Sequence, residues 1–213
     1  MLIPAVFAEH SDGGLRASFP DEGATIPGHG GDVPFAEAAG LIPRGDSRGI
    51  AAVVDMDSLR SGEFREGVVK GMRIRGSDIW FMTCIRDADD LMDAFNTTAD
   101  RVLAPMHLIS DESEARDIVS VSDSVIPVVF ASGKSALHGR WNVADVRGAL
   151  MKLESLGFYR VCMLDADGSV ADDDWSWISD QFPSAVPFVS DASRLDGYGF
   201  EDVIAPLRPA PRP

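Results

Sequence analysis

Residues 142–170, NVADVRGALMKLESLGFYRVCMLDADGSV, contain the pattern that decides the fold. Apolar residues recur every three or four positions from 146 to 156, which predicts a helix with one buried face. Gly157 follows, where a helix commonly ends on a left-handed residue. Residues 158–164 are short and β-prone and predict a buried strand. The acidic turn 165–169 comes directly after that strand, so the stretch reads as helix, strand and polar turn.

The same unit recurs along the chain. Strands are predicted at 2–8, 49–57, 78–85, 101–108, 125–131, 158–164 and 185–189, and helices at 35–41, 63–74, 87–95, 112–121, 146–156, 175–182 and 199–207. Alternating strands and helices favour parallel strand pairing with the helices outside. Asp87 is the expected N-cap of its helix. The Gly- and Pro-rich residues 11–34 predict a long loop.

A half-chain repeat favours a barrel over an open sheet. Two predicted strands end in the same D-x-D pattern, at Asp55 and Asp57 and again at Asp165 and Asp167, 165 − 55 = 110 residues apart. A repeat of that length is expected of two joined half-barrels. We therefore predict a (βα) TIM-type barrel, one domain over residues 1–207, followed by a disordered tail at 208–213.

Only seven strands are predicted, so the eighth βα unit is expected to be truncated or irregular. Unpaired strand edges are normally covered. We expect the long loop, the tail or a second copy of the chain to fill this gap, which makes a homodimer one expected assembly.

Composition excludes several classes of function. The net charge of −15 disfavours nucleic acid and anionic membranes as partners. No apolar run is long enough for a membrane helix, and the start of the chain lacks the pattern of a signal peptide. The two cysteines, Cys84 and Cys162, have no zinc-site spacing. We expect a cytoplasmic protein with a small-molecule partner and without cofactor or resident metal.

The motifs LIPAV at residues 2–6, VVDMD at 53–57 and LDADGS at 164–169 resemble the phosphoribosyl isomerase family of histidine biosynthesis (ProFAR isomerase). Gly139, Arg140 and Trp141 also resemble a Gly-Trp pair of that family. The resemblance spans most of the chain in the right order. It implies a TIM barrel with internal two-fold symmetry and a phosphosugar ancestor, and it places Ser169 where the family has a catalytic threonine.

The chain departs from that family at its working positions. Phe7 stands where the family has its first catalytic aspartate, and Phe130 or Ala131 stands where it has the second. Its phosphate-binding glycine turns are replaced by residues 82–84 and 190–192. Because the Amadori isomerisation needs two acid/base groups, we do not expect this chain to perform it.

Candidate site residues are the polar residues at the predicted carboxyl ends of the strands, where barrel enzymes place their chemistry. The candidates for catalysis are Asp55, His107, Lys134, Asp165 and Ser169, and those for substrate binding are Asp57, Thr83, Arg140, Asp167, Gly168, Ser190 and Asp191. Each has a structural alternative. The aspartates can hold loops, a lone histidine is more often structural, and a loop lysine is more often solvated than a Schiff-base former. No ligand spacing demands a metal.

Three functions remain open. The first is an enzyme, isomerase- or lyase-like, with changed chemistry on a small phosphorylated or carboxylated metabolite. The second is a barrel without catalysis that serves as a binding or scaffold subunit. The third is a phosphoribosyl isomerase with relocated catalytic residues.

Overall fold

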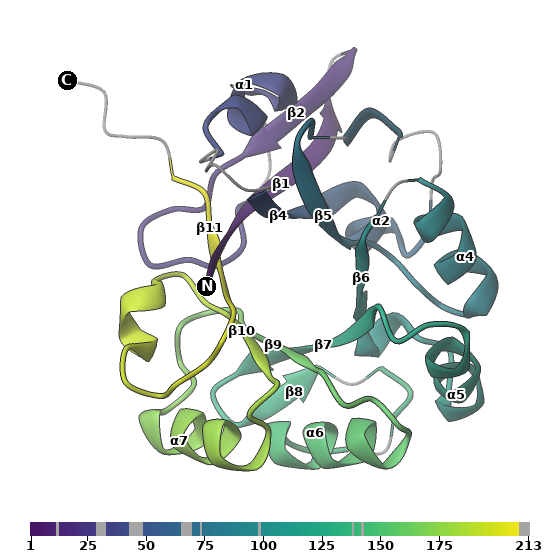
Figure 1. Cartoon of the computed structure of the whole chain (residues 1–213), viewed down its shortest axis with the longest axis vertical. Helices are drawn as coiled ribbons and strands as arrows, with labels where there is room; N and C mark the ends of the chain where they lie inside the picture. Colours follow the sequence, from purple (N-terminus) through teal and green to yellow (C-terminus); the bar gives the residue numbers. More distant parts are fainter. Residues whose placement is uncertain are drawn as a thin grey trace.

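Eight parallel strands close into a barrel (Figure 1) in the computed structural model, which describes residues 1–11, 13–28, 33–42, 49–64, 70–72, 74–97, 99–137, 139–141 and 143–208. The order around the barrel is β1 (Leu2–Ser11), β4 (Gly49–Asp55), β5 (Ser77–Met82), β6 (Arg101–Pro105), β7 (Val125–Ser132), β9 (Cys162–Asp165), β10 (Val186–Phe188) and β11 (Val203–Pro206). β11 pairs in parallel with both β10 and β1, which closes the ring. The predicted α/β barrel is confirmed.

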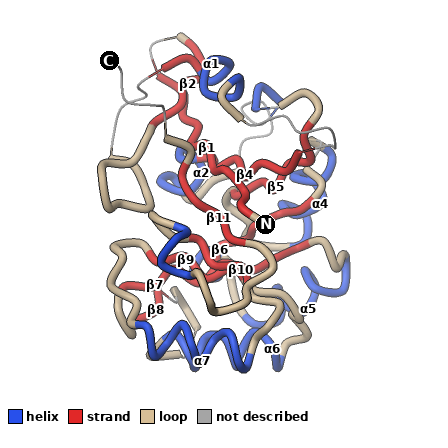
Figure 2. The backbone as a smooth tube through the Cα atoms, turned by 60° about the vertical axis from the view of Figure 1, so that its left-hand side comes forward, coloured by secondary structure: helices blue, strands red, loops and turns tan. Residues whose placement is uncertain are grey.

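Helices lie outside the barrel, between successive strands (Figure 2). They are α1 (Phe35–Gly40), α2 (Met56–Ser61), α4 (Ala88–Asn96), α5 (Glu112–Val121), α6 (Val146–Ser155) and α7 (Asp172–Gln181), with 3-10 turns η1 (Lys70–Met72), η2 (Met106–Leu108) and η3 (Ala192–Leu195). Asp87 caps α4 by accepting a hydrogen bond from the Asp90 N–H, as predicted. In the part of the chain that is described, no helix has the length and apolar character needed to cross a bilayer.

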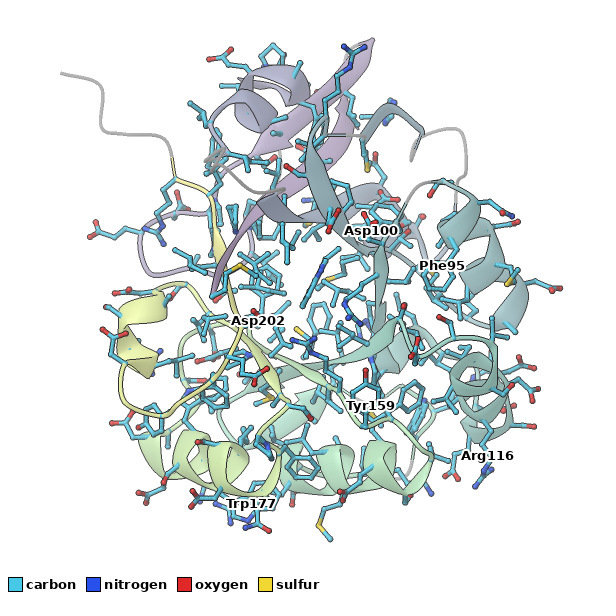
Figure 3. All side chains as sticks on the ribbon, in the orientation of Figure 1. Phe95, Asp100, Arg116, Tyr159, Trp177 and Asp202 are labelled. Carbon is cyan, nitrogen blue, oxygen red and sulfur yellow. The ribbon has the colours of Figure 1, made fainter. Side chains whose placement is uncertain are left out.

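Alternation along each strand produces two hydrophobic clusters. One set of side chains points into the barrel and includes Phe7, Val54, Leu164 and Phe188. Their neighbours point outward and pack under the helices. Figure 3 shows side chains filling the space that the strands enclose, so the barrel is a packed core and not a pore.

The amino-terminal end of the barrel is closed by a cation–π arrangement. The Arg101 and Arg160 guanidinium carbons lie 5.6 Å and 5.0 Å from the centroid of the buried Trp80 ring. Arg160 also pairs with Asp202, which lies 3.7 Å from the amino terminus. These contacts tie β5, β6 and the segment before β9 to the start of β11, which is a stabilising role.

The prediction for residues after 195 is wrong in one respect. The segment expected to form a helix at 199–207 contains strand β11, so the eighth strand exists. Within the described residues it pairs with both β10 and β1, and the expected gap in the barrel is therefore absent. Gly197 and Gly199 take positive φ values of 101° and 80°, which interrupt a helix. Beyond them, Ile204 and Pro206 are buried while their neighbours are half-buried, which is the alternation of a strand.

Other boundaries also differ from the sequence prediction. The long loop contains a hairpin strand, β2 (Gly14–Ser18), which pairs antiparallel with β1, and the short β3 (Val33–Pro34). Another short strand, β8 (Ser135–Leu137), pairs with β7. Of the helix predicted at 63–74, residues 65–69 and 73 lie outside the described residues, and the described remainder has only the turn η1. Residues 209–213 of the predicted tail also lie outside them.

Candidate functional site

The two D-x-D motifs occupy equivalent positions at the carboxyl end of the barrel. Asp55 ends β4 and Asp165 ends β9, the second and sixth strands around the ring. Asp55 is paired with Ala8 of β1, and Asp165 is paired in the same way with Ala131 of β7. The positions four strands apart agree with the half-chain repeat predicted from sequence.

Asp55 belongs to a closed hydrogen-bond network. Its Oδ1 accepts from the Ser58 N–H (3.1 Å) and its Oδ2 accepts from the Thr83 hydroxyl (3.2 Å). The Ser58 and Thr83 hydroxyls are 2.7 Å apart, and all three residues are buried. Burial raises the pKa of Asp55, and the hydrogen bonds from Ser58 and Thr83 oppose that rise. Oδ1 caps α2 and Oδ2 is held by Thr83, so Asp55 joins the start of α2 to the end of β5.

Asp165 has a different environment. Its Oδ1 accepts from the backbone N–H groups of Ser169 (3.1 Å) and Val170 (3.4 Å). Its Oδ2 is buried and has no hydrogen-bond partner among the described residues, and the nearest cation is Arg194, whose Nη1 lies 3.5 Å away. Burial raises the pKa of Asp165, while Val170 and Arg194 counteract it. The Asp165 carboxylate is therefore in contact with the Arg194 guanidinium on the protein side.

Ser169 links two loops and is not a free hydroxyl. It donates to Asp167, and its oxygen accepts from the Gly133 N–H at 2.6 Å. Asp167 also accepts from the Ser132 hydroxyl at 2.6 Å, and these hydroxyl contacts lower the pKa of Asp167. The turn after β7 is thus joined to the turn after β9.

His107 and Lys134 lie in separate surroundings. The His107 ring is partly buried against Phe130 (centroids 5.0 Å apart), its Nδ1 has no hydrogen-bond partner in the described chain, and burial lowers its pKa to about 4. Lys134 is exposed in the β7–β8 turn, where it lines a smaller hollow with Asp145, Arg147 and Asp174. Between described residues, no hydrogen bond or ion pair joins either side chain to Asp55 or Asp165. The predicted catalytic residues are thus not linked into one constellation.

The remaining polar candidates either form structural hydrogen bonds or are exposed to solvent. Asp57 accepts from the His10 N–H at 2.7 Å and ties α2 to β1. Arg140 is exposed near the close approach of Gly139 to His107. Cys84 is a buried thiol whose pKa is raised to about 11 by burial, so it is not a nucleophile at ordinary pH.

The centre of the barrel mouth is apolar. Phe7 and Phe188 lie with ring centroids 6.0 Å apart, and Ile26 and Phe130 pack against the same interior cluster. The buried Thr25 hydroxyl donates to the Asp165 carbonyl at 2.5 Å. Thr25 therefore anchors the described residues 19–28 to the end of β9.

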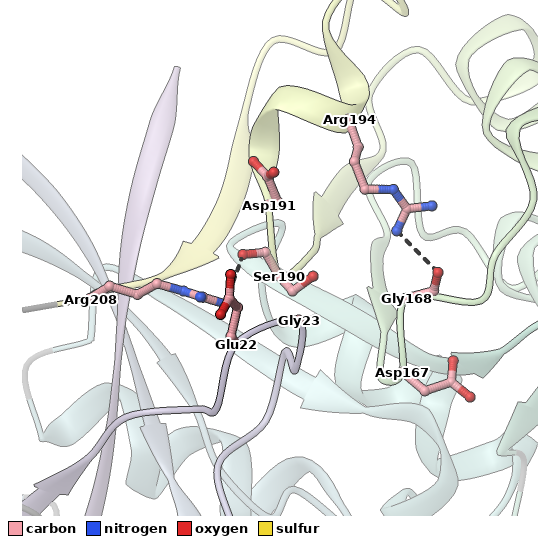
Figure 4. A pocket seen from close by; sticks show the side chains of 8 residues that line it. All are labelled: Glu22, Gly23, Asp167, Gly168, Ser190, Asp191, Arg194 and Arg208. Atoms are coloured by element: carbon pink, nitrogen blue, oxygen red, sulfur yellow. Dashed lines mark hydrogen bonds between the residues drawn. The ribbon is translucent and has the colours of Figure 1, made fainter.

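An open cleft of about 630 Å³ is formed by the loops after β9, β10 and β11 together with the segment after β2 (Figure 4). Four of the predicted substrate-binding residues line it, together with four residues that the sequence pattern does not indicate. The full lining is Glu22, Gly23, Asp167, Gly168, Ser190, Asp191, Arg194 and Arg208. Asp167, Gly168, Ser190 and Asp191 are the predicted members.

Two arginines supply the positive charge of the cleft. Arg194 donates to the carbonyls of Gly168 (3.1 Å) and Val170 (3.4 Å), and Arg208 approaches the Ser190 carbonyl at 3.5 Å (Figure 4). The Asp191 side chain caps η3 through Ser193, which is the main cause of its lowered pKa, and both arginines add to the effect. Arg194 and Arg208 therefore flank Asp191.

Among the described residues, no group of three or more His, Cys, Asp or Glu side chains could hold a metal ion. Comparison of the chain with protein-family models and with curated proteins finds no match.

Proposed function

We propose that this barrel binds a small phosphorylated or carboxylated metabolite in the cleft at the carboxyl ends of β9, β10 and β11. The observation that carries the proposal is the pair Arg194 and Arg208 in the loops after the seventh and eighth strands. Those loops, with a short helix nearby, frequently form the phosphate site of (βα)8 barrels. Here η3 supplies the short helical turn, and arginine suits phosphate and carboxylate because its planar fork donates two hydrogen bonds at once.

The geometry of Arg194 supports this assignment. Three oxygen-bearing groups contact its guanidinium, namely the Asp165 carboxylate and the carbonyls of Gly168 and Val170. A side chain fixed in this way loses little conformational entropy when a ligand binds. The Asp165 Oδ2, buried without a hydrogen bond within the described chain, gives this arginine a local counter-charge.

We further propose that the chain does not perform the Amadori isomerisation implied by its resemblance to the ProFAR isomerase family. By this resemblance, Phe7 stands at the first acid/base position of that family and Phe130 or Ala131 at the second, and all three side chains pack in hydrophobic clusters. None of these side chains can transfer a proton. Asp55 and Ser169 are engaged in structural hydrogen bonds.

A second candidate is a barrel without catalysis that serves as a binding or scaffold subunit. The apolar mouth under Thr25 and Ile26 favours it, since the usual catalytic position of a barrel is filled by side chains. Such a subunit would bind its ligand in the same cleft as the enzyme proposed above, but it would not convert that ligand into a product.

Isothermal titration with glycerol 3-phosphate and with inorganic phosphate tests the binding proposal. The double variant Arg194→Gln/Arg208→Gln should lose binding at least about tenfold, because each charge-assisted contact contributes about 1.5–3 kcal/mol. Arg116→Gln is the matched control, since Arg116 is exposed on α5 beside Glu112 and outside the cleft. Equal binding by the double variant and the wild type would contradict the proposal.

Growth of a histidine auxotroph that lacks phosphoribosyl isomerase tests the reaction. We expect no rescue by this chain. Rescue that is lost again with Asp165→Asn would establish the isomerase instead.

A further inference from the structure

One buried carboxylate depends on an arginine of the cleft for its counter-charge. The Asp165 side chain is buried, and its Oδ2 has no hydrogen-bond donor among the described residues. Arg194 Nη1 lies 3.5 Å from this carboxylate oxygen, and the Arg194 side chain is 35% exposed and lines the cleft. The same side chain thus contacts a buried carboxylate and is accessible to a ligand.

The equivalent aspartate of the other D-x-D motif has a hydrogen bond in place of this charge. The pairing of β4 with β5 has the same register as the pairing of β9 with β10. That register places Thr83 beside Asp55 and Val189 beside Asp165. The Thr83 hydroxyl donates to Asp55 Oδ2 at 3.2 Å, whereas valine has no hydroxyl to donate. The second half of the barrel therefore leaves Asp165 Oδ2 with Arg194 alone.

Burial and two nearby charges determine the ionisation of Asp165. Burial raises its pKa most, the Val170 N–H and the Arg194 charge lower it, and the neighbouring Asp167 raises it. The adjoining residues of β7, of the end of β10 and of the segment 19–28 are uncharged, namely Ala131, Val189 and Thr25. The Arg194 guanidinium is therefore the charge that favours the ionised form of Asp165.

We propose that the anion site takes up a proton when it binds its ligand, and that Asp165 receives this proton. The inference rests on the proposed anion-binding function and concerns the regulation of that site by pH. An anion bound at Arg194 brings a second negative charge to one guanidinium, which disfavours the ionised form of Asp165. Protonation of Asp165 leaves the guanidinium in place, because Arg194 also donates to the carbonyls of Gly168 and Val170.

The direction of the pH dependence follows from linkage. A bound anion raises the pKa of Asp165, so between the two pKa values the complex holds a proton that the free protein does not hold. The affinity for the anion therefore rises as the pH falls through the pKa of the complex, and it becomes constant below the pKa of the free protein. Two negative charges about 7 Å apart at an effective dielectric constant of about 20 give a pKa change of about one unit or more, or about tenfold in affinity.

The test is isothermal titration of the full chain with sulfate, which keeps both negative charges throughout the pH range. The wild type should bind sulfate up to about tenfold more tightly at about pH 5 than at about pH 8. Titrations in buffers of different ionisation enthalpy count the protons that are taken up. A pKa change of about one unit predicts a maximum of about half a proton for each sulfate bound.

Matched variants assign the proton to its residue. Asp165→Asn keeps an oxygen to accept from the backbone N–H groups of its turn, but it cannot titrate, so the proton uptake should disappear. The control Asp55→Asn removes the equivalent carboxylate and should keep the uptake. Val189→Thr supplies the hydroxyl that Thr83 gives to Asp55, which should move the rise in affinity to lower pH.

The outcomes separate the two proposals. Equal sulfate affinity at both pH values without proton uptake overturns the linkage and leaves the anion site standing. Uptake that survives in Asp165→Asn overturns the assignment to Asp165. If Asp165→Asn does not fold, an unchanged pH dependence in Val189→Thr overturns the assignment instead. Failure of sulfate to bind overturns the linkage, and failure of inorganic phosphate to bind as well overturns the anion site.

Discussion

Replacing His107 by Gln should reduce the loss of stability that the protein suffers in acid. Burial against Phe130 lowers the pKa of His107 to about 4, from an ordinary value near 6.5. Between these values the unfolded chain binds a proton that the folded chain does not bind. The free energy of unfolding therefore falls as the pH falls from about 6.5 towards 4.

The size of this effect follows from the same two values. Full linkage between pH 7 and pH 4.5 amounts to about 2.5 kcal/mol, given about 1.4 kcal/mol for each of the two pH units between 6.5 and 4.5 in which mainly the unfolded state is protonated. The ring is partly exposed, and solvent screening reduces the expected effect to about 1–2 kcal/mol. Glutamine has no charge to gain, so this contribution is absent from His107→Gln.

Urea unfolding at pH 7 and at pH 4.5 measures the effect. The stability difference between wild type and His107→Gln should shift by about 1–2 kcal/mol in favour of the variant on acidification. The control His10→Gln, at an exposed position beside Asp57, should retain the acid sensitivity that arises from His107. A difference that stays constant with pH would refute the burial argument.

Three further substitutions test the structural contacts. Thr83→Val leaves the buried Asp55 Oδ2 without its hydroxyl donor and should cost about 1–3 kcal/mol in urea unfolding, whereas Ser120→Ala on the exposed face of α5 should change stability by less than about 0.5 kcal/mol. Gly139→Ala places a Cβ 2.3 Å from the His107 carbonyl oxygen, so it should lower the thermal midpoint more than Gly76→Ala, which has a positive φ but open space; an equal loss would contradict the close approach. Asp87→Ala removes the acceptor for the Asp90 N–H and should cost about 1 kcal/mol, against a near-neutral Asp93→Ala on the exposed face of α4.

The alternation of strands and helices was predictable because local periodicity determines it. Residues 112–121 show this well, since an acidic start and a buried stripe define α5 without tertiary information. The eighth strand was not predictable in the same way. β11 has four residues, and its strand conformation depends on pairing with β1 and β10, which are distant in sequence.

The candidate site also has residues that local sequence pattern predicts and residues that depend on tertiary contacts. Asp167, Gly168, Ser190 and Asp191 were found because strand ends in a barrel converge at one end. The sequence pattern does not reveal Arg194, because this residue lies on η3, beyond the residues that directly follow β10. It does not reveal Arg208 either, because the pattern predicts a helix where β11 forms. Ser169 and Asp55 looked catalytic from their positions, but their hydrogen bonds to Gly133, Ser58 and Thr83 depend on tertiary geometry that one sequence does not reveal.

A crystal structure of the protein with glycerol 3-phosphate tests the proposed anion site most directly, because it locates the phosphoryl group. We expect the phosphoryl group in the cleft, within hydrogen-bond distance of Arg194 or Arg208. A phosphoryl group bound elsewhere, for example at the exposed Lys134 or beside Arg101, would contradict it.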